Sequence, residues 1–169
     1  MIQEFSHNAI TWLDVVHPTT DDIRTILETC HVPTEFAGDL TSTTPRTMAR
    51  GFKGAFKITL DFPVVKREDV KHPHEIKFIV TKSHLITIRF EDIAALHTFS
   101  KELEVINILK SGSKKATGAH LFLTLLAYLY NNLDEKLDYL ESKIQDTEEH
   151  LFQDNEKEML FEISNISRR

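Results

Sequence analysis

The sequence is poor in the residues that mark several classes of protein. Its single cysteine, Cys30, excludes an internal disulfide and favours a reducing compartment. Only five glycines and five prolines occur among 169 residues, which excludes collagen-like and low-complexity chains. The longest mainly apolar run, from Leu121 to Tyr130, is about half of the roughly 20 residues that a membrane-spanning helix needs. With 41% apolar and 27% charged residues, the chain can nevertheless build a core.

Negative charge is concentrated in the C-terminal third. Residues 1–116 contain 15 acidic and 15 basic side chains, whereas residues 117–169 contain 11 acidic and 5 basic ones, so the second part carries the whole net charge of −6. A chain with this net charge is not expected to bind nucleic acid. The short N-terminus, residues 1–6, lacks the basic and apolar regions of a signal peptide, and none is predicted.

Residues 1–112 favour an α/β domain. Strands are predicted over 10–16, 47–53, 55–65, 75–80 and 85–90, where apolar residues alternate or cluster. Helices are predicted from a cap near Thr19 to about Cys30, over 34–40, and from an N-cap at Asp92 to about Leu109. The charged stretch 66–73 is expected to be a loop. The expected sheet residues, most of them buried, are Trp12, Phe56, Ile58, Leu60, Phe78, Val80, Ile86 and Ile88.

Residues 113–169 are predicted to form a long helical hairpin arm after a polar linker over 111–115. Apolar residues here recur every three or four positions instead of every two, and this helical spacing continues for about 35 residues. The stripe consists of Phe122, Leu126, Leu129, Leu133, Leu137, Leu140, Ile144 and Leu151. A break is expected at 154–155, followed by a second helix over about 159–166 that has no C-cap signal, which predicts that it continues beyond Arg169. So long a helix must pack on another helix or another subunit.

Motifs for enzyme chemistry are missing from the sequence. It contains no glycine-rich phosphate loop and no C-x-x-C, H-E-x-x-H or G-x-S-x-G motif, so no enzymatic activity and no catalytic residue are predicted. His72 and His74 flank Pro73 and are of a type that ligates metals. Exposed loop histidines without partners are much commoner, and no site is predicted there.

Seven carboxylates on the predicted long helix allow two interpretations. They are Asp134, Glu135, Asp138, Glu141, Asp146, Glu148 and Glu149. The first interpretation is the solvated face of an amphipathic helix. The second is that such faces from several subunits meet and repel one another, and that divalent cations bind between them and reduce the repulsion. Carboxylates and water are the ligands that Mg²⁺ prefers.

The order of these elements resembles the N-terminal cytosolic domain of CorA-family divalent-cation (magnesium/cobalt) transporters. Residues 11–15 and 18–23 look like the family's opening strand and helix, and Pro45-Arg46 with the strands that follow is similar to its R-P-(R/K) turn and hairpin. Residues 78–88 resemble the hairpin in which one strand ends in T-K, and residues 121–151 resemble the first of two long helices beside a central stalk.

This resemblance implies an α/β fold with a mixed β-sheet and helices on both faces, plus long C-terminal helices. It implies a pentamer at the cell membrane, with this segment on the cytoplasmic side and membrane contact only through helices downstream of Arg169. No cofactor is implied, and Mg²⁺ or Co²⁺ is expected as the transported and regulatory ion. The one regulatory ligand it points to is Asp39, at an inter-subunit position, with Gly38 an equally plausible match.

The function expected from the resemblance is a cytosolic regulatory domain that couples the intracellular divalent-cation level to gating. The zinc-transporting branch of the same superfamily is an alternative, because the pore that selects the ion is not in this sequence. A soluble adaptor whose long helix binds a partner helix is an alternative of a different class.

Overall fold

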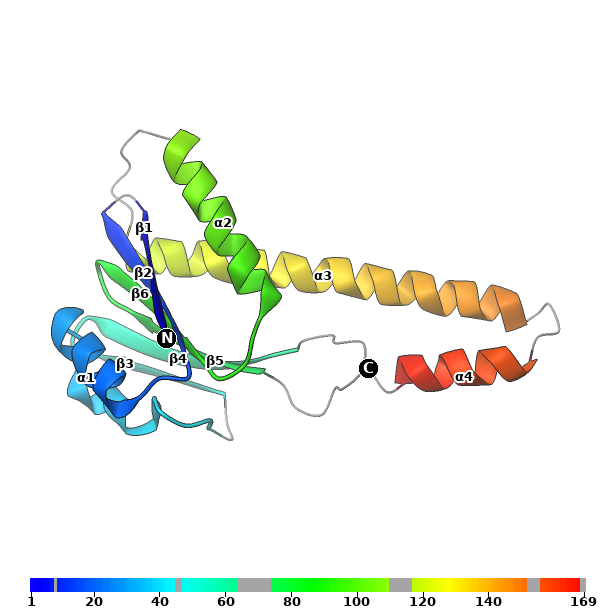
Figure 1. Ribbon diagram of the computed structural model, residues 1–169, viewed down its shortest axis with the longest axis horizontal. Helices are drawn as coiled ribbons and strands as arrows, with labels where there is room; N and C mark the ends of the chain where they lie inside the picture. The colour runs from blue at the N-terminus through cyan, green and yellow to red at the C-terminus, as the bar shows by residue number, and fades with distance from the viewer. Residues whose placement is uncertain (8, 45–46, 64–73, 110–116, 152–155, 168–169) are drawn as a thin grey trace.

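A single six-stranded sheet organises the molecule, as a computed structural model shows (Figure 1). The structure describes residues 1–7, 9–44, 47–63, 74–109, 117–151 and 156–167. The strands are β1 (Ile2–His7), β2 (Ile10–Val16), β3 (Met48–Phe52), β4 (Ala55–Phe62), β5 (His74–Val80) and β6 (His84–Arg89), in the spatial order β1-β2-β6-β5-β4-β3. The β2–β6 pair is parallel and the other neighbours are antiparallel, which confirms the mixed sheet.

Helices cover both faces of this sheet, as predicted. They are α1 (Thr20–Thr29), the 3₁₀ helix η1 (Thr34–Asp39), α2 (Ala94–Leu109), α3 (Gly118–Leu151) and α4 (Glu156–Ser167). Apolar side chains of α1 and η1 pack against one face, and those of α2 and the start of α3 pack against the other. Figure 1 shows α3 projecting far beyond the sheet, with α4 running back along it.

The start of α1 follows the predicted capping chemistry. The Thr19 hydroxyl accepts a hydrogen bond from the backbone N–H of Asp22 at 3.1 Å, and the Asp22 carboxylate accepts one from the Thr19 N–H at 2.9 Å. The second of these bonds is the main reason that the pKa of Asp22 lies below its ordinary value. This capping box fixes the first turn, so that Ile23 and Ile26 point into the core.

Strand β1 is not among the strands predicted from the sequence. It pairs with β2 along its whole length, and the N-terminal ammonium of Met1 donates to the Val16 carbonyl at 2.9 Å. The Phe5 ring lies 4.8 Å from that of Trp12, centroid to centroid. Residues 2–7 are therefore an edge strand of the sheet rather than part of a short tail.

All eight predicted sheet residues lie in strands, and most are buried. Trp12, Phe78, Val80, Ile86 and Ile88 are buried, whereas Phe56, Ile58 and Leu60 of β4 are only half-buried. On β4 the opposite side is the more buried one, with Ala55, Lys57 and Thr59 inside. The alternation predicts the strand correctly but not which side of β4 is more deeply covered.

Several boundaries differ from the predicted ones. Strand β4 ends at Phe62, the helix expected over 34–40 is 3₁₀ in type, and α2 begins at Ala94. The carboxylate of Asp92, the predicted N-cap, is engaged by Arg89 and by His97 on α2. The predicted loop over 66–73, the linker over 111–115 and the break at 154–155 lie outside the described residues.

Candidate functional site

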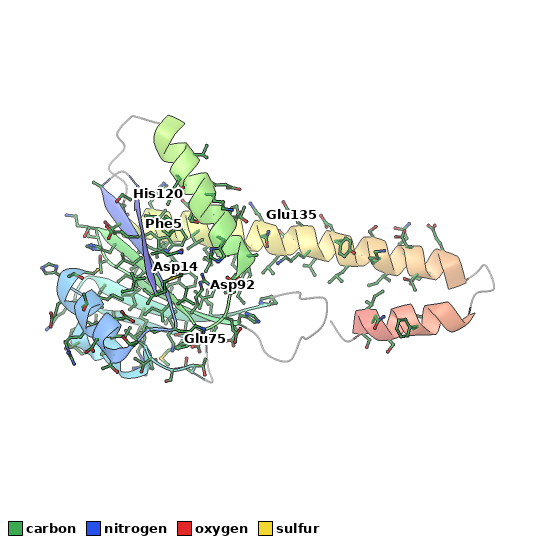
Figure 2. All side chains as sticks on the ribbon, in the orientation of Figure 1. Phe5, Asp14, Glu75, Asp92, His120 and Glu135 are labelled. Atoms are coloured by element: carbon green, nitrogen blue, oxygen red, sulfur yellow. The ribbon has the colours of Figure 1, made fainter. Side chains whose placement is uncertain are left out.

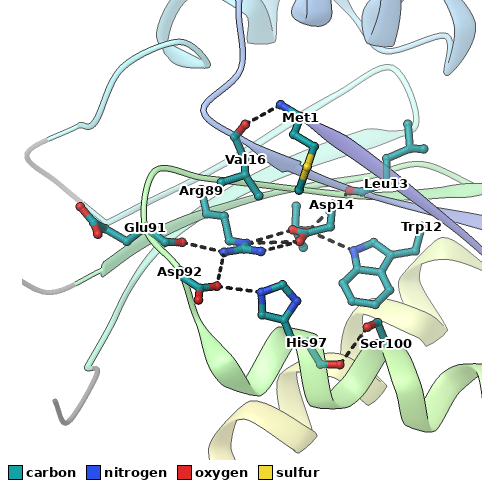
Figure 3. Close-up of polar contacts among 11 residues, drawn as sticks. Met1, Trp12, Leu13, Asp14, Val16, Arg89, Glu91, Asp92, His97 and Ser100 are labelled. Atoms are coloured by element: carbon teal, nitrogen blue, oxygen red, sulfur yellow. Dashed lines mark hydrogen bonds and ion pairs between the residues drawn. The ribbon is translucent and has the colours of Figure 1, made fainter.

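A buried ion pair joins the two parallel strands on the face that α2 and α3 cover (Figure 3). Arg89 of β6 donates from Nη2 to Asp14 Oδ2 at 2.9 Å and from Nε to the same oxygen at 3.2 Å. Arg89 is 1% exposed and Asp14 2%. Thr87 donates to Asp14 Oδ1 at 2.7 Å and accepts from the Trp12 indole at 3.0 Å. These bonds offset the cost of burying both charges.

The same guanidinium reaches towards the surface through Asp92. Its Nη1 donates to Asp92 Oδ1 at 3.2 Å and to the Glu91 carbonyl at 2.8 Å. Asp92 Oδ1 also lies 2.8 Å from Nε2 of His97 on α2. The hydrogen bond with His97, and then the charges of His97 and Arg89, hold the pKa of Asp92 below its ordinary value. The chain of contacts therefore fastens β2 and β6 to the first turn of α2, which is a structural role.

Asp39, the predicted regulatory ligand, ends η1 on the opposite face of the sheet. Its Oδ1 forms an ion pair with Nζ of Lys57 on β4. The lysine side chain is 3% exposed and the aspartate side chain 24%, so the pair lies at the rim of the buried region. The ammonium also lies over the Phe36 ring of η1, 5.9 Å from its centroid.

A second buried lysine, Lys77 of β5, holds the loop that follows Asp39. Its Nζ donates to the backbone carbonyls of Asp39 and Ser42 and lies 3.1 Å from Oε1 of Glu75. Glu75 Oε2 in turn accepts from the backbone N–H of Thr44 at 2.8 Å and from its hydroxyl. Asp39, Lys57, Glu75 and Lys77, called here the lysine cluster, hold two positive and two negative charges.

The lysine cluster does not fit a divalent cation held by this chain alone. Mg²⁺ requires oxygen ligands, but the Asp39 carboxylate already faces an ammonium group and its carbonyl faces another. Two such charges at close range repel a further cation. An inter-subunit site that joins Asp39 to ligands of a neighbour stays a prediction. Gly38, the alternative match, has open space at its Cβ position: outside its own helix and chain neighbours, no atom of the described residues lies within 4 Å.

The other candidate metal ligands, the two histidines and the α3 carboxylates, also form no metal site within the described residues. His72 lies outside the described residues. His74 begins β5, and its buried Nδ1 has no hydrogen-bond partner among the residues that the structure describes. Within the described ranges, no group of three or more His, Cys, Asp or Glu side chains could hold a metal. The seven carboxylates of α3 are all exposed, as the first interpretation predicts, and Figure 2 shows Glu135 on the part of α3 beyond the sheet.

The long helix is anchored to the sheet at its first residue. The N–H of Gly118 donates to the Lys82 carbonyl, in the turn between β5 and β6, at 3.0 Å. A Cβ at this position would lie 2.3 Å from the Thr81 carbonyl oxygen and 2.4 Å from that of His84, so a glycine is required for this approach. Four side chains in the first turns of α3 are also buried, and they fix the helix to the sheet. They are Leu121, Phe122, Leu125 and Leu129.

Beyond the sheet, the helices expose large apolar side chains. The distal arm, defined as residues 134–151 of α3 together with α4, exposes Leu137, Tyr139, Ile144, Phe161 and Ile163. An apolar groove of about 270 Å³ lies between the two helices, next to Thr147 and Ile166. None of the helices over the described residues has the length and apolar character needed to cross a membrane.

Solved structures share this arrangement of sheet and long helix. The CorA magnesium transporter from Methanocaldococcus jannaschii matches 95% of this chain with a TM-score of 0.72 and 13% identity. The ZntB cytoplasmic domain from Vibrio parahaemolyticus matches 99% with a TM-score of 0.65 and 18% identity. The full-length CmaX protein matches 94% with a TM-score of 0.69 and 12% identity. At these identities the likeness shows a common fold and confirms the predicted one.

The match covers this chain more completely than it covers its relatives. The chain spans 50% of the M. jannaschii transporter, 50% of CmaX and 73% of the ZntB domain. No curated protein matches it in sequence. The profile of the family described as CorA-like Mg2+ transporter protein matches residues 7–169, which confirms the resemblance found in the sequence, and the chain therefore belongs to the CorA-like Mg²⁺ transporter family.

Proposed function

We propose that this chain is the cytoplasmic, regulatory part of a membrane transporter for divalent cations, with Mg²⁺ or Co²⁺ as the transported ion. In the proposed assembly, five copies lie on the cytoplasmic side of the cell membrane, and the membrane-crossing helices belong to sequence outside residues 1–169. The observation that carries the proposal is the family match over nearly the whole chain. It is supported by a fold in which the first turns of the long helix are buried against the sheet.

The anchoring of α3 supplies a way to couple the cation level to gating. The helix has 34 residues, or about 50 Å at 1.5 Å per residue, and its first turns are part of the core. A small rotation of the sheet of one subunit relative to that of the adjacent subunit would therefore cause a larger displacement at the far end of α3. Cations that screen carboxylates between subunits would favour one arrangement, and their loss would release it.

The exposed acidic face supports a response to divalent cations at the assembly level. All seven α3 carboxylates reach solvent, and such faces repel one another when several copies approach a common axis. Asp39 is the sequence-based candidate for an inter-subunit ligand. The isolated chain is expected to be monomeric or weakly associated, because the contacts that would hold the acidic faces together are not within it.

Transport is tested with the complete product of the encoding gene. We expect the gene to continue past the codon of Arg169 into two apolar stretches of about 20 residues with a G-M-N signature. Proteoliposomes with this product should take up Mg²⁺ down its gradient, and liposomes with residues 1–169 alone should not. A stop codon after Arg169, or no Mg²⁺ or Co²⁺ flux by the complete product, would contradict the proposal and favour the soluble adaptor.

Zinc transport is a second candidate, favoured by the match to the ZntB cytoplasmic domain, which covers 99% of this chain. The two candidates differ in the ion that the complete product moves. Uptake of Zn²⁺ that exceeds uptake of Mg²⁺ and Co²⁺ at equal concentrations would select the zinc branch. Uptake of Mg²⁺ that excess Zn²⁺ does not reduce would exclude it.

A further inference from the structure

Lys57 is placed as a permanent counter-ion for Asp39. Its side chain is 3% exposed, its ammonium pairs with the Asp39 carboxylate, and the Phe36 ring covers it from η1. An ammonium that is buried in this way would be left with an uncompensated charge if Asp39 turned away towards another cation. The pair therefore resists any rearrangement that frees the carboxylate.

Lys77 contacts the backbone of the same segment, from Asp39 to Ser42. Its ammonium donates to the Asp39 and Ser42 carbonyls, which are the kind of backbone oxygens that hard cations use as ligands, and it pairs with Glu75 at 3.1 Å. Glu75 is fixed in turn by Thr44. Residues 39–44 are thus wrapped around an ammonium group that belongs to the protein.

We propose that Lys57 and Lys77 act as built-in cations, so that the segment around Asp39 has the same arrangement with or without divalent cations. The inference deepens the proposed function and rests on it for the idea that Asp39 is a regulatory candidate. In this chain, a cation would have to displace Lys57 before it could bind Asp39. Control by divalent cations then lies elsewhere in the assembly, with the exposed acidic face of α3 as the available surface.

The experiment is a titration of thermal unfolding with MgCl₂ from 0 to about 10 mM, with NaCl added to hold the ionic strength constant. It uses the complete 169-residue chain, and the fluorescence of its only tryptophan, Trp12, reports on the sheet. The unfolding midpoints of the wild type and of Asp39→Asn should respond to Mg²⁺ in the same way. Lys57→Met should unfold at a lower temperature and regain roughly 3–6 °C at 10 mM Mg²⁺ if the freed Asp39 binds with a millimolar Kd.

The controls separate this effect from general screening. The double variant Lys57→Met with Asp39→Asn should lose the regained stability, and Lys53→Met, which removes an exposed lysine from the β3–β4 turn, should show none. If Lys57→Met does not fold, Lys57→Gln, which keeps a hydrogen-bond donor near Asp39, takes its place.

Two results would overturn the inference. One is a Mg²⁺-dependent stabilisation of the wild type that Asp39→Asn abolishes, because Asp39 would then bind the cation in spite of Lys57. The other is a folded Lys57 variant that gains nothing from Mg²⁺, because the lysine would then not be what excludes the cation. Neither result bears on ion flux by the complete gene product, so the proposed function stands or falls separately.

Discussion

The part of the molecule around the sheet and the distal arm are stabilised in different ways. The head, defined as the sheet with α1, η1, α2 and residues 118–133 of α3, has both sheet faces covered, and its buried charges are paired. In the distal arm, Leu137 is 57% exposed and Phe161 71%. Because apolar burial is the main stabilising contribution, we expect the head to hold this chain together and the distal arm to gain its contacts on assembly.

The difference also explains where charge is found. In the head, Asp14, Arg89, Lys57 and Lys77 occupy the interior, and each has a partner that is held by further hydrogen bonds. In the distal arm, the seven α3 carboxylates are exposed to solvent cations and to other subunits. Buried pairs specify one arrangement of the strands, whereas exposed carboxylates leave the association of subunits open to control by ions.

The largest expected effect is that of removing the central side chain of the head. Trp12 is fully buried and contacts Phe5 and Phe99, so Trp12→Ala should lower the free energy of unfolding by about 3–5 kcal/mol. Leu137→Ala, in the distal arm, should change it by no more than about 0.5 kcal/mol. Urea unfolding followed by circular dichroism measures both, and equal losses would remove the distinction between head and distal arm.

A similar loss is expected when the buried arginine is removed. Arg89→Ala leaves the Asp14 carboxylate buried without its counter-ion and should cost about 3–5 kcal/mol. The matched control is Arg24→Ala on α1, which breaks an exposed pair with Asp21 at 3.0 Å and should cost less than about 1 kcal/mol. The comparison would fail if the two variants had the same urea midpoint.

A smaller effect is expected at the junction of head and arm. The Cβ of Gly118→Ala would overlap two carbonyl oxygens of the β5–β6 turn, and the helix must shift at a cost of about 1–3 kcal/mol. Gly38→Ala, where the new methyl group would point into open space, should leave stability unchanged or slightly raised. The thermal unfolding midpoints of the two variants measure this difference. A Gly118→Ala variant with the midpoint of the wild type would show that the β5–β6 turn does not hold α3 tightly.

The smallest predicted effect is a pH dependence at the same junction. Burial, followed by the charge of His31, lowers the pKa of His84 from its ordinary value of 6.5, although Glu4 opposes the shift. The unfolded chain therefore binds this proton more readily than the folded one. The contribution of His84 to stability is complete above about pH 6.5 and declines as the pH falls below that value.

The measurement is the unfolding midpoint between pH 7.5 and 5.5. His84→Gln should flatten its decline towards acid relative to the wild type, and His120→Gln, which alters an exposed histidine on α3, serves as the reference. A slope that is the same for His84→Gln and the wild type would mean that this histidine does not distinguish the folded from the unfolded state.

The sequence predicts most of the fold because its elements have strong local patterns. The capping box at Thr19, the alternation in β4 and β6 and the long helical stripe of α3 each depend on residues close in the chain. Strand β1 is missed because four of its six residues are polar and its apolar residues, Ile2 and Phe5, lie three positions apart, so it has no strand alternation. It is stabilised by pairing with β2 rather than by its own pattern. Such pairing is not visible in one segment alone.

The buried charges could not be predicted for a related reason. Lys57 and Lys77 alternate with apolar residues, which in a sheet covered on one face would place them in solvent. Here η1 and the segment after it cover that second face, and the lysines become internal. The sequence signals Asp39 only through the family resemblance, and it does not indicate that a residue 18 positions away, Lys57, pairs with it.

Hydrogen exchange of the backbone amides along the complete chain tests the contrast between head and distal arm most directly. Amides of β2, β5 and β6 should exchange only when the whole head unfolds, and those of residues 136–149 and α4 should exchange at least about 100-fold faster. Equal protection of the strands and of the distal arm would contradict the account, because the exposed helices would then be as stable as the core without any further contact.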